Sequence, residues 1–168
     1  MALTLSRVHE LFDYKDGNLI WKFAKSRRVK AGEIAGYLGD EGYIDVGVDG
    51  GIYKAHRLIY FYHNGYFPSF IDHIDGNRSN NKIDNLRSAT ISQNAMNQKI
   101  STKNSSGVKG VYWHKRDKKW VVQLKVNFKR HYFGYFNDKK AAELVAVEAT
   151  NKLHKEFSAY KGVLNGTA

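Results

Sequence analysis

Residues 71–98 hold the side chains best suited to chemistry in this 168-residue chain. An aspartate and a histidine are adjacent there, at Asp72 and His73, and a loop rich in Gly and Asn follows. Imidazole titrates near neutral pH, so His73 is suited to take a proton from water. Asp72 and Asn94 carry oxygen atoms of the kind that hard divalent cations prefer. The set predicts metal-assisted hydrolysis of a phosphodiester bond.

The spacing of these residues adds two expectations and leaves one alternative. Adjacent residues of a strand point to opposite faces, so Asp72 and His73 must approach a shared site from different directions or sit on a distorted strand. We expect Asn85 or Asn80 to accept the other imidazole proton and fix the tautomer. The alternative is purely structural, because Asn, Asp and Gly are ordinary turn formers.

The elements that precede this stretch are predicted from periodicity. Apolar spacing over residues 3–14 predicts a helix with Ser6 as its N-cap. Residues 42–48 alternate apolar and polar side chains, and after the turn at 49–51 residues 52–55 return as a hairpin. Residues 56–62 suit either a strand or a helix, and we favour a helix that ends near Asn64-Gly65.

A different pattern follows the polar residues 101–107, which we take as a linker. Three strands are predicted, then one amphipathic helix, at 110–115, 120–126, 130–136 and 138–154. A helix that covers one face of a three-stranded sheet makes a complete small domain. The fold class is therefore α+β. An N-terminal β-rich region leads into a unit of two strands and a helix at about 70–98, which completes a domain of residues 1–100, and a sheet-plus-helix domain follows at 108–160.

Charge is distributed unevenly along the chain. The net charge is +11, of which residues 1–100 supply +2 and residues 101–168 supply +9. The pI is about 9.7. A basic half interleaved with aromatic residues favours nucleic-acid binding, with a solvated basic surface as the plainer alternative.

Composition also excludes several classes of protein. Cysteine is absent, so disulfides and cysteine-based zinc sites are excluded, which suits a reducing cytoplasm. No apolar run approaches the length of a membrane span, and the N-terminus lacks the features of a secretion signal. We therefore expect a soluble, cytoplasmic protein without a membrane partner.

Strand alternation predicts a functional face on the C-terminal sheet. The face turned toward the helix should carry Val111, Trp113, Val122, Leu124 and Phe133. The opposite face should carry basic, polar and aromatic side chains, namely Tyr112, His114, Gln123, Lys125, Arg130 and Tyr132. Such a face can enter the major groove of double-stranded DNA, where Arg, Lys and Gln read base edges.

The whole run from Asp-His through Asp-Gly-Asn, Asn-Asn and Asn-Leu-Arg to Gln-Asn strongly resembles the HNH endonucleases with a ββα-metal motif, in particular the phage and intron-encoded homing type. The resemblance covers about residues 42–98, because GYIDVGVDGGIYKAHRLI is also similar to the family. It implies that Asp72 and Asn94 bind one divalent metal and that His73 is the general base. The family's middle Asn falls on Asn85, with Asn81 as the second choice.

The resemblance extends to the metal and to the neighbouring basic residues. The third motif position is Asn, as in the homing subgroup, which implies Mg²⁺, or Mn²⁺, and no zinc. Arg57 and Arg87 are candidates to hold a phosphate, with structural ion pairing as the alternative for each. We expect a structural role for His56.

The C-terminal segment resembles a second family. Gly-Val, Lys-Trp, an aromatic-Phe-Gly-aromatic-Phe strand end and an Ala-Ala helix, over about residues 106–158, are similar to the DNA-binding domain of plant ethylene-response factors. That resemblance implies groove contacts at Lys109, Tyr112, His114, Arg116, Gln123, Lys125, Arg130 and Tyr132.

The sequence thus predicts a site-specific DNA endonuclease of the homing type that leaves 5′-phosphate and 3′-hydroxyl ends. Its predicted partner is double-stranded DNA, and we favour a monomer. The alternative is a sequence-specific DNA-binding regulator with a relict nuclease motif. A structural or RNA-binding protein ranks third. The sequence leaves open the DNA target and whether one or both strands are cut.

Overall fold

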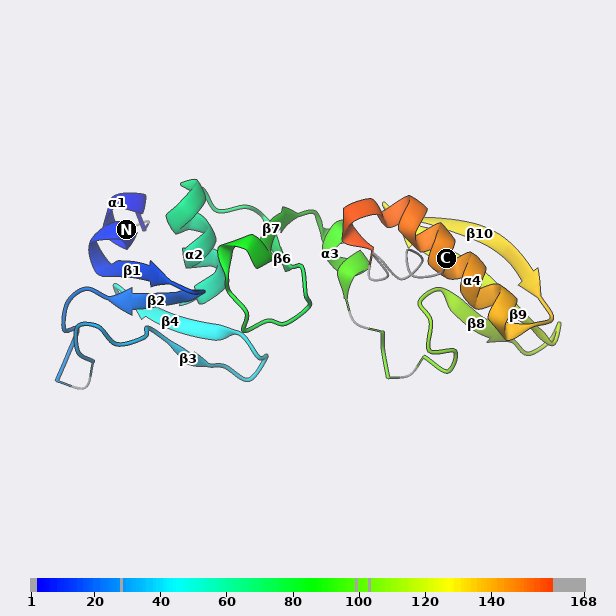
Figure 1. The fold of residues 1–168 in the computed structure, drawn as a ribbon, viewed down its shortest axis with the longest axis horizontal. Coiled ribbons are helices and arrows are strands. Elements are labelled where there is room, and N and C mark those ends of the chain that lie inside the picture. Colours follow the sequence, from blue (N-terminus) through cyan, green and yellow to red (C-terminus); the bar gives the residue numbers. More distant parts are fainter. Residues whose placement is uncertain (1–2, 28, 99, 103, 159–168) are drawn as a thin grey trace, which may run out of the picture. The chain divides into compact units, whose positions relative to one another are not determined.

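The chain forms two compact units, Met1–Ala89 and Thr90–Ala168, in a computed structural model that describes residues 3–27, 29–98, 100–102 and 104–158 (Figure 1). Each unit has an apolar core of its own. The predicted linker at 101–107 and the domain bounds drawn from it stay predictions. Lys103 of that linker and residues 159–160 of the predicted C-terminal domain lie outside the described residues.

The first unit begins with a helix that is shorter than the sequence predicts. α1 (Leu5–Leu11) has Thr4 as its N-cap, and the Thr4 hydroxyl accepts a hydrogen bond from the Arg7 N–H at 3.2 Å, so the predicted cap at Ser6 is wrong. Residues 12–14 were predicted as the end of this helix, but they belong to β1 (Phe12–Lys15), which pairs with β2 (Asn18–Trp21). Residues 12–15 form a hairpin with β2 instead of a longer helix because the two strands bury Phe12, Leu19 and Trp21.

A three-stranded antiparallel sheet and a helix follow. The sheet has the order β3 (Tyr37–Leu38), β4 (Ile44–Val48) and β5 (Gly51–Lys54), and the predicted hairpin at 42–55 forms β4 and β5. β3 was not expected, because two residues carry too little periodicity. α2 (Ala55–Asn64) is the helix favoured for residues 56–64, and it ends at Gly65 in the left-handed conformation (φ 76°).

A third hairpin completes the first unit. β6 (Phe70–His73) pairs antiparallel with β7 (Leu86–Ala89), and a loop followed by the 3₁₀ turn η1 (Ile83–Asn85) connects them. The hairpin reaches the unit's core through Ile71 and Leu86, which cluster with residues of all the earlier layers, among them Val8, Phe12, Leu19, Trp21, Val46, Val48, Leu58 and Ile59.

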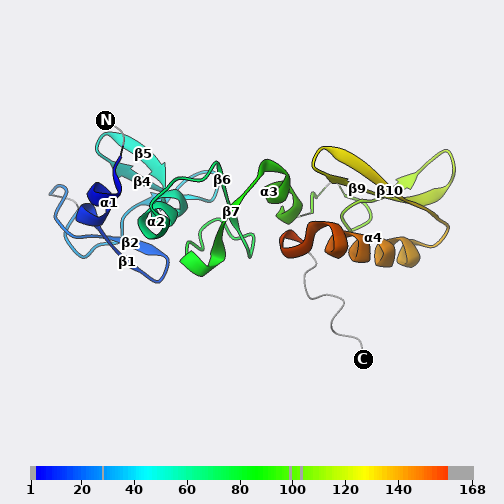
Figure 2. The ribbon, with the colours of Figure 1, turned by 90° about the horizontal axis from the view of Figure 1, so that it is seen from above.

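The second unit begins with α3 (Ile91–Asn97) and contains the predicted sheet and helix. β8 (Val111–His114), β9 (Lys119–Val126) and β10 (Lys129–Phe136) form an antiparallel sheet in the order β10-β9-β8. α4 (Lys139–His154) runs along one face of this sheet, followed by the 3₁₀ turn η2 (Lys155–Phe157) (Figure 2). The mixed α/β character with a three-stranded sheet and one covering helix is confirmed.

Small side chains bring α4 close to the sheet. Ala142 and Ala146 are fully buried against Val111 and Val122. The Asp138 carboxylate caps the helix by accepting from the Ala141 N–H at 2.8 Å. Among the helices of the described residues, none has the length and apolar character needed to cross a membrane.

Gly110 is a position at which the second unit tolerates no side chain. Its φ is 77°, and an added Cβ would lie 2.7 Å from the carbonyl oxygen of Gln123 and closer still to the Leu124 side chain. We expect Gly110→Ala to lower the free energy of unfolding by about 3 kcal/mol, through backbone strain and overpacking together. Urea unfolding followed by the fluorescence of Trp113 and Trp120, which lie in this unit, measures the loss.

Gly107 supplies the matched control. Its φ is 80°, but no atom lies within 4 Å of an added Cβ. Gly107→Ala should therefore cost only the left-handed strain, ~1 kcal/mol. Equal losses in the two variants would contradict the steric argument.

Candidate active site

The β6–β7 hairpin places Asp72 and His73 side by side in a buried position. In the antiparallel register Asp72 lies opposite Arg87 and His73 lies opposite Leu86. Asp72 is 4% exposed and His73 is 5% exposed. Burial of a charged or polar group is costly without a polar partner, so each side chain must find one within the unit.

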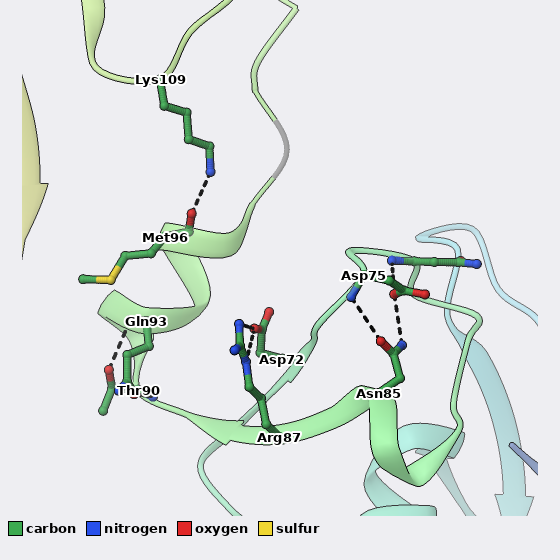
Figure 3. A network of polar contacts seen from close by, with 9 residues as sticks. Asp72, Asp75, Asn85, Arg87, Thr90, Gln93, Met96 and Lys109 are labelled. Atoms are coloured by element: carbon green, nitrogen blue, oxygen red, sulfur yellow. Dashed lines mark hydrogen bonds and ion pairs between the residues drawn. The ribbon is translucent and has the colours of Figure 1, made fainter. Parts of the chain in front are cut away.

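Asp72 has a cationic partner directly across the hairpin. Arg87 contacts the same carboxylate oxygen, Oδ2, through Nη2 at 2.7 Å and through Nε at 2.9 Å (Figure 3). Arg87 was considered as a phosphate contact or as a structural ion-pair partner, and in the structure it forms an ion pair with Asp72. The pair gives the buried carboxylate a polar partner and fixes the rotamer of the Asp72 side chain.

His73 is held by a carboxamide from the loop. Its Nε2 lies 3.0 Å from Oδ1 of Asn81, a residue that is 3% exposed. Since Asn81 Oδ1 is an acceptor, Nε2 carries the proton and Nδ1 is the basic nitrogen of this tautomer. The prediction that Asn85 or Asn80 accepts this proton is therefore wrong for Nε2. The sequence contains four Asn between residues 77 and 85, and only the path of the loop decides which of them reaches the ring.

Asn85 holds the loop itself. Its side chain accepts from the Asp75 N–H at 3.0 Å and donates to Asp75 Oδ1 at 3.0 Å and to the Asn80 carbonyl at 2.8 Å (Figure 3). Asn80 in turn donates to Asp75 Oδ2 at 2.7 Å. Burial favours the neutral form of Asp75, but hydrogen bonds from Asn80, Asn77 and Asn85 outweigh it and lower the pKa of this carboxyl. A catalytic role for Asn85 stays a prediction.

Aromatic rings pack around His73. His56, in the first turn of α2, lies edge-on to the His73 ring with 5.0 Å between centroids, and Tyr43 lies 5.0 Å from His56. The Arg78 guanidinium lies 4.9 Å from the Tyr43 ring and donates to the Glu41 carbonyl at 2.8 Å. Sequence reasoning missed Tyr43 and Arg78, because their pairing joins loops that are distant in sequence.

His56 is uncharged in this environment. It is 7% exposed, and burial, together with the nearby His73 and Arg57, lowers its pKa to about 3. Its Nδ1 has no hydrogen-bond partner among the residues that the structure describes. A neutral ring beside His73 adds no positive charge next to the predicted base.

Two further candidates are placed less directly. Arg57 donates through Nη2 to the Pro68 carbonyl at 3.1 Å and lies 5.6 Å from the Phe67 ring, which fits the structural alternative. Asn94 is half-buried on α3, in the second unit, whereas Asp72 and His73 belong to the first. The assignment of Asn94 as a metal ligand stays a prediction.

The two side chains predicted as metal ligands carry atoms of the kind that a hard cation prefers. Asp72 offers carboxylate oxygens, and Asn94 offers a carboxamide oxygen. The described residues contain no group of three or more His, Cys, Asp or Glu that could hold a metal ion.

The predicted DNA-binding residues are mostly gathered on the uncovered face of the second unit's sheet. Residues opposite each other in the register share a face, which aligns Tyr112 with Val121, Gln123 with Tyr132, and Lys125 with Arg130. A bulge between Tyr132 and Gly134 lets Phe133 pack with the helix-side core and returns Tyr135 to the uncovered face. The predicted face residues His114, Tyr112, Gln123, Lys125, Arg130 and Tyr132 therefore do lie on one side.

Lys109 and Arg116 differ from the other members of that set. Lys109 Nζ donates to the carbonyl oxygen of Met96 at 2.8 Å. Arg116 lies in the turn between β8 and β9, where its Nε is 2.9 Å from Asp117 Oδ1 and its side chain is 86% exposed. Arg116 can still reach a phosphate, whereas the Lys109 amine is engaged within its own unit.

Burial of His56 predicts that the first unit loses stability in acid. The unfolded chain takes up a proton at His56 near pH 6.5, but the folded chain does so only near pH 3. Stability is therefore fully present above pH 6.5 and falls toward pH 3, with a slope of up to ~1.4 kcal/mol per pH unit. His56→Phe, which has no proton to take up, should flatten the slope between pH 4 and 6.5.

Urea unfolding at a series of pH values, followed by Trp21 fluorescence in a background with Trp113→Phe and Trp120→Phe, reports on the first unit alone. Asp49 and Asp75, whose pKa values are lowered, add an acid-sensitive contribution that both chains share. If the free energy of unfolding depends on pH equally steeply with and without the His56→Phe substitution, the burial of His56 does not cause the loss of stability in acid.

Comparisons with known proteins agree with this geometry. Residues 53–96, which run from β5 through α3, match the model of an HNH endonuclease family. The chain is 44% identical over 78 residues to an uncharacterized HNH endonuclease of Acanthamoeba polyphaga mimivirus, a match that covers 45% of this chain and 41% of that protein. No solved structure matches.

A longer match comes from protein 3.8 of Escherichia phage T7. The two chains are 34% identical over 116 residues, which is 65% of this chain and 93% of the phage protein. The chain therefore belongs to the family of protein 3.8 of phage T7 and, through its HNH endonuclease domain, is a nuclease.

Proposed function

We propose that the chain is a site-specific DNA endonuclease of the homing type, in which His73 is the general base. The observation that carries the proposal is the hydrogen bond from His73 Nε2 to Asn81 Oδ1, which holds the imidazole next to Asp72 and its partner Arg87. The retention of Asp72, His73 and Asn94 disfavours the alternative of a regulator with a relict motif.

His73 acts on the attacking water. Its Nδ1 takes a proton from the water while the oxygen attacks phosphorus, and the P–O3′ bond breaks. This leaves a 5′-phosphate and, once the 3′ oxygen is protonated, a 3′-hydroxyl. Asn81 keeps Nε2 protonated throughout, so the ring presents only one basic nitrogen.

Asp72 and Asn94 would hold one Mg²⁺, with Mn²⁺ as a substitute and no zinc. When bound, the ion compensates negative charge on the phosphate and on the leaving oxygen. Arg87 fixes the rotamer of Asp72, although a cation on this carboxylate must share it with the guanidinium. The positive charge of Arg87 near the site also favours an approaching phosphate.

The second unit supplies affinity for double-stranded DNA. Its uncovered sheet face combines the cations of Lys125 and Arg130 with Tyr112, Tyr132 and Tyr135, which are 40%, 60% and 54% exposed. Burial and the neighbouring tyrosines raise the pKa of Tyr112, so its hydroxyl stays a neutral donor. The similarity to ethylene-response-factor domains supports major-groove binding by this face, with Lys109 as an exception.

The biological setting follows from the relatives. Both the phage T7 protein and the mimivirus protein are viral, which supports a bacteriophage origin and a site of action in the host cytoplasm. A monomer acting once would nick one strand.

His73→Ala separates chemistry from binding. Because the general base is lost while the sheet face is untouched, we expect cleavage to fall by about 10²- to 10⁴-fold. Duplex affinity in a gel shift should stay within about two-fold of wild type. Full cleavage by the variant would remove His73 from the mechanism.

Cleavage of a supercoiled plasmid carrying phage DNA tests the metal site. We expect conversion to open-circular or linear product with Mg²⁺, none with EDTA, and little with Asn94→Ala. Gln98→Ala, which removes an exposed carboxamide just after the end of α3, is the control and should retain cleavage. Cleavage that persists in EDTA, or that survives Asn94→Ala unchanged, would refute the assigned metal site.

A further inference from the structure

α3 is a short helix that the rest of the second unit must hold in place. It has seven residues, and a capping box closes its first turn, with the Thr90 side chain accepting from Gln93 N–H at 3.2 Å and the Gln93 side chain accepting from Thr90 N–H at 2.8 Å (Figure 3). Isolated helices of this length are unstable in water. The orientation of α3 therefore depends on contacts with residues outside it.

Two hydrogen bonds fix α3, one near each end. Ser92 Oγ accepts from the backbone N–H of Asn127, in the turn between β9 and β10, at 3.0 Å. Lys109 Nζ donates to the Met96 carbonyl oxygen at 2.8 Å (Figure 3). That oxygen belongs to the last turn, where carbonyls lack intrahelical partners and the helix dipole favours a cation.

Apolar contact adds a third anchor at Met96. Its side chain is 7% exposed and lines a pocket of about 300 Å³ together with Leu124 and His154. Because no side chain of the described residues fills this space, the apolar packing that these residues provide against α3 is incomplete. The hydrogen bonds at Ser92 and Lys109 therefore contribute more to the position of the helix than they would over a packed interface.

Asn94 lies on the opposite side of α3 from these anchors. Successive helical residues are rotated by about 100°, so Asn94 is about 160° away from both Ser92 and Met96. The contacts that turn Ser92 and Met96 toward the rest of the second unit therefore leave Asn94 on the side of α3 that faces away from those contacts.

We infer that Lys109 is a positioning residue for Asn94, the proposed metal ligand, rather than a contact to DNA. This rests on the proposed function. Lys109 directly precedes Gly110 and β8, so the sheet that binds DNA also sets the orientation of the helix that carries the ligand. The second unit then has two tasks, to hold the duplex and to present Asn94.

Lys109→Met tests this role, since it keeps most of the side-chain stem and removes the donor. The substrate is a plasmid that the wild-type chain cuts, and the duplex is a fragment that spans the cut. We expect the half-saturating Mg²⁺ concentration for cleavage to rise ~10-fold, as for other residues that orient metal ligands. Mn²⁺ affinity, measured by electron paramagnetic resonance without turnover, should fall by a similar factor. Duplex affinity should change by less than about two-fold.

Lys125→Met is the matched control, because it removes the same charge from the uncovered sheet face. It should weaken duplex binding and reduce the salt slope by about one, while leaving Mn²⁺ affinity unchanged. Ser92→Ala removes the other hydrogen-bonded anchor of α3 and should behave like Lys109→Met. Ser92→Ala therefore replaces Lys109→Met in these measurements if Lys109→Met fails to fold.

Combination with Asn94→Ala separates positioning from a general structural effect. If Lys109 acts through Asn94, Lys109→Met should not weaken Mn²⁺ binding further in the Asn94→Ala chain. Weaker duplex binding with unchanged Mn²⁺ affinity in Lys109→Met would overturn the inference and make Lys109 a phosphate contact. Normal Mn²⁺ affinity in Asn94→Ala alone would instead overturn the proposed metal site on which the inference rests.

Discussion

The burial of two adjacent polar side chains on one four-residue strand is the constraint on which the first unit depends. Asp72 and His73 leave β6 on opposite sides, and both are almost fully withdrawn from solvent. Each needs a polar partner on its own side of the hairpin. The pairing register supplies Arg87 to one side, and the loop supplies Asn81 to the other. A one-residue slip of this hairpin would separate both pairs at once.

The loop between β6 and η1 can supply Asn81 only if its own path is fixed. Asp75 is the centre of that arrangement, because it accepts hydrogen bonds from the side chains of Asn80 and Asn85 and from the Asn77 N–H. Arg78 then joins the loop to the segment before β4 through the Tyr43 ring and the Glu41 carbonyl. These contacts replace the bracing that cysteine-bound zinc would give, which this chain, having no cysteine, must do without.

Periodicity predicted the elements whose burial it directly encodes. The β4–β5 hairpin and the sheet and helix of the second unit have amphipathic or alternating patterns, and each formed close to its expected bounds. α2, whose apolar run suits either a strand or a helix, formed as the favoured helix. β1 was mistaken for helix because Phe12 fits both periods, and only the pairing with β2 decides between them. Strict alternation predicted the sheet face correctly as far as Tyr132, but it would place Tyr135 on the helix side, whereas the bulge between Tyr132 and Gly134 returns Tyr135 to the uncovered face. Side-chain partners were harder to predict than elements. The choice among Asn80, Asn81 and Asn85 for the imidazole depends on loop geometry, which has no period. Lys109 was assigned to DNA through the resemblance to a family of DNA-binding domains, whereas its contact with Met96 depends on where α3 lies within the second unit.

The Asp72–Arg87 pair is better explained by chemistry than by stability. Withdrawing two charges from water costs several kcal/mol, and a well-packed apolar pair of similar volume is often equally stable or more so. A hairpin selected for stability alone would have no reason to bury a carboxylate here, with a side chain 5% exposed. What the pair does achieve is a carboxylate in a fixed rotamer beside an imidazole whose Nε2 is bound to Asn81. In the proposed mechanism both side chains are then already in place when the substrate arrives, and such preorganisation is what a hydrolytic site requires.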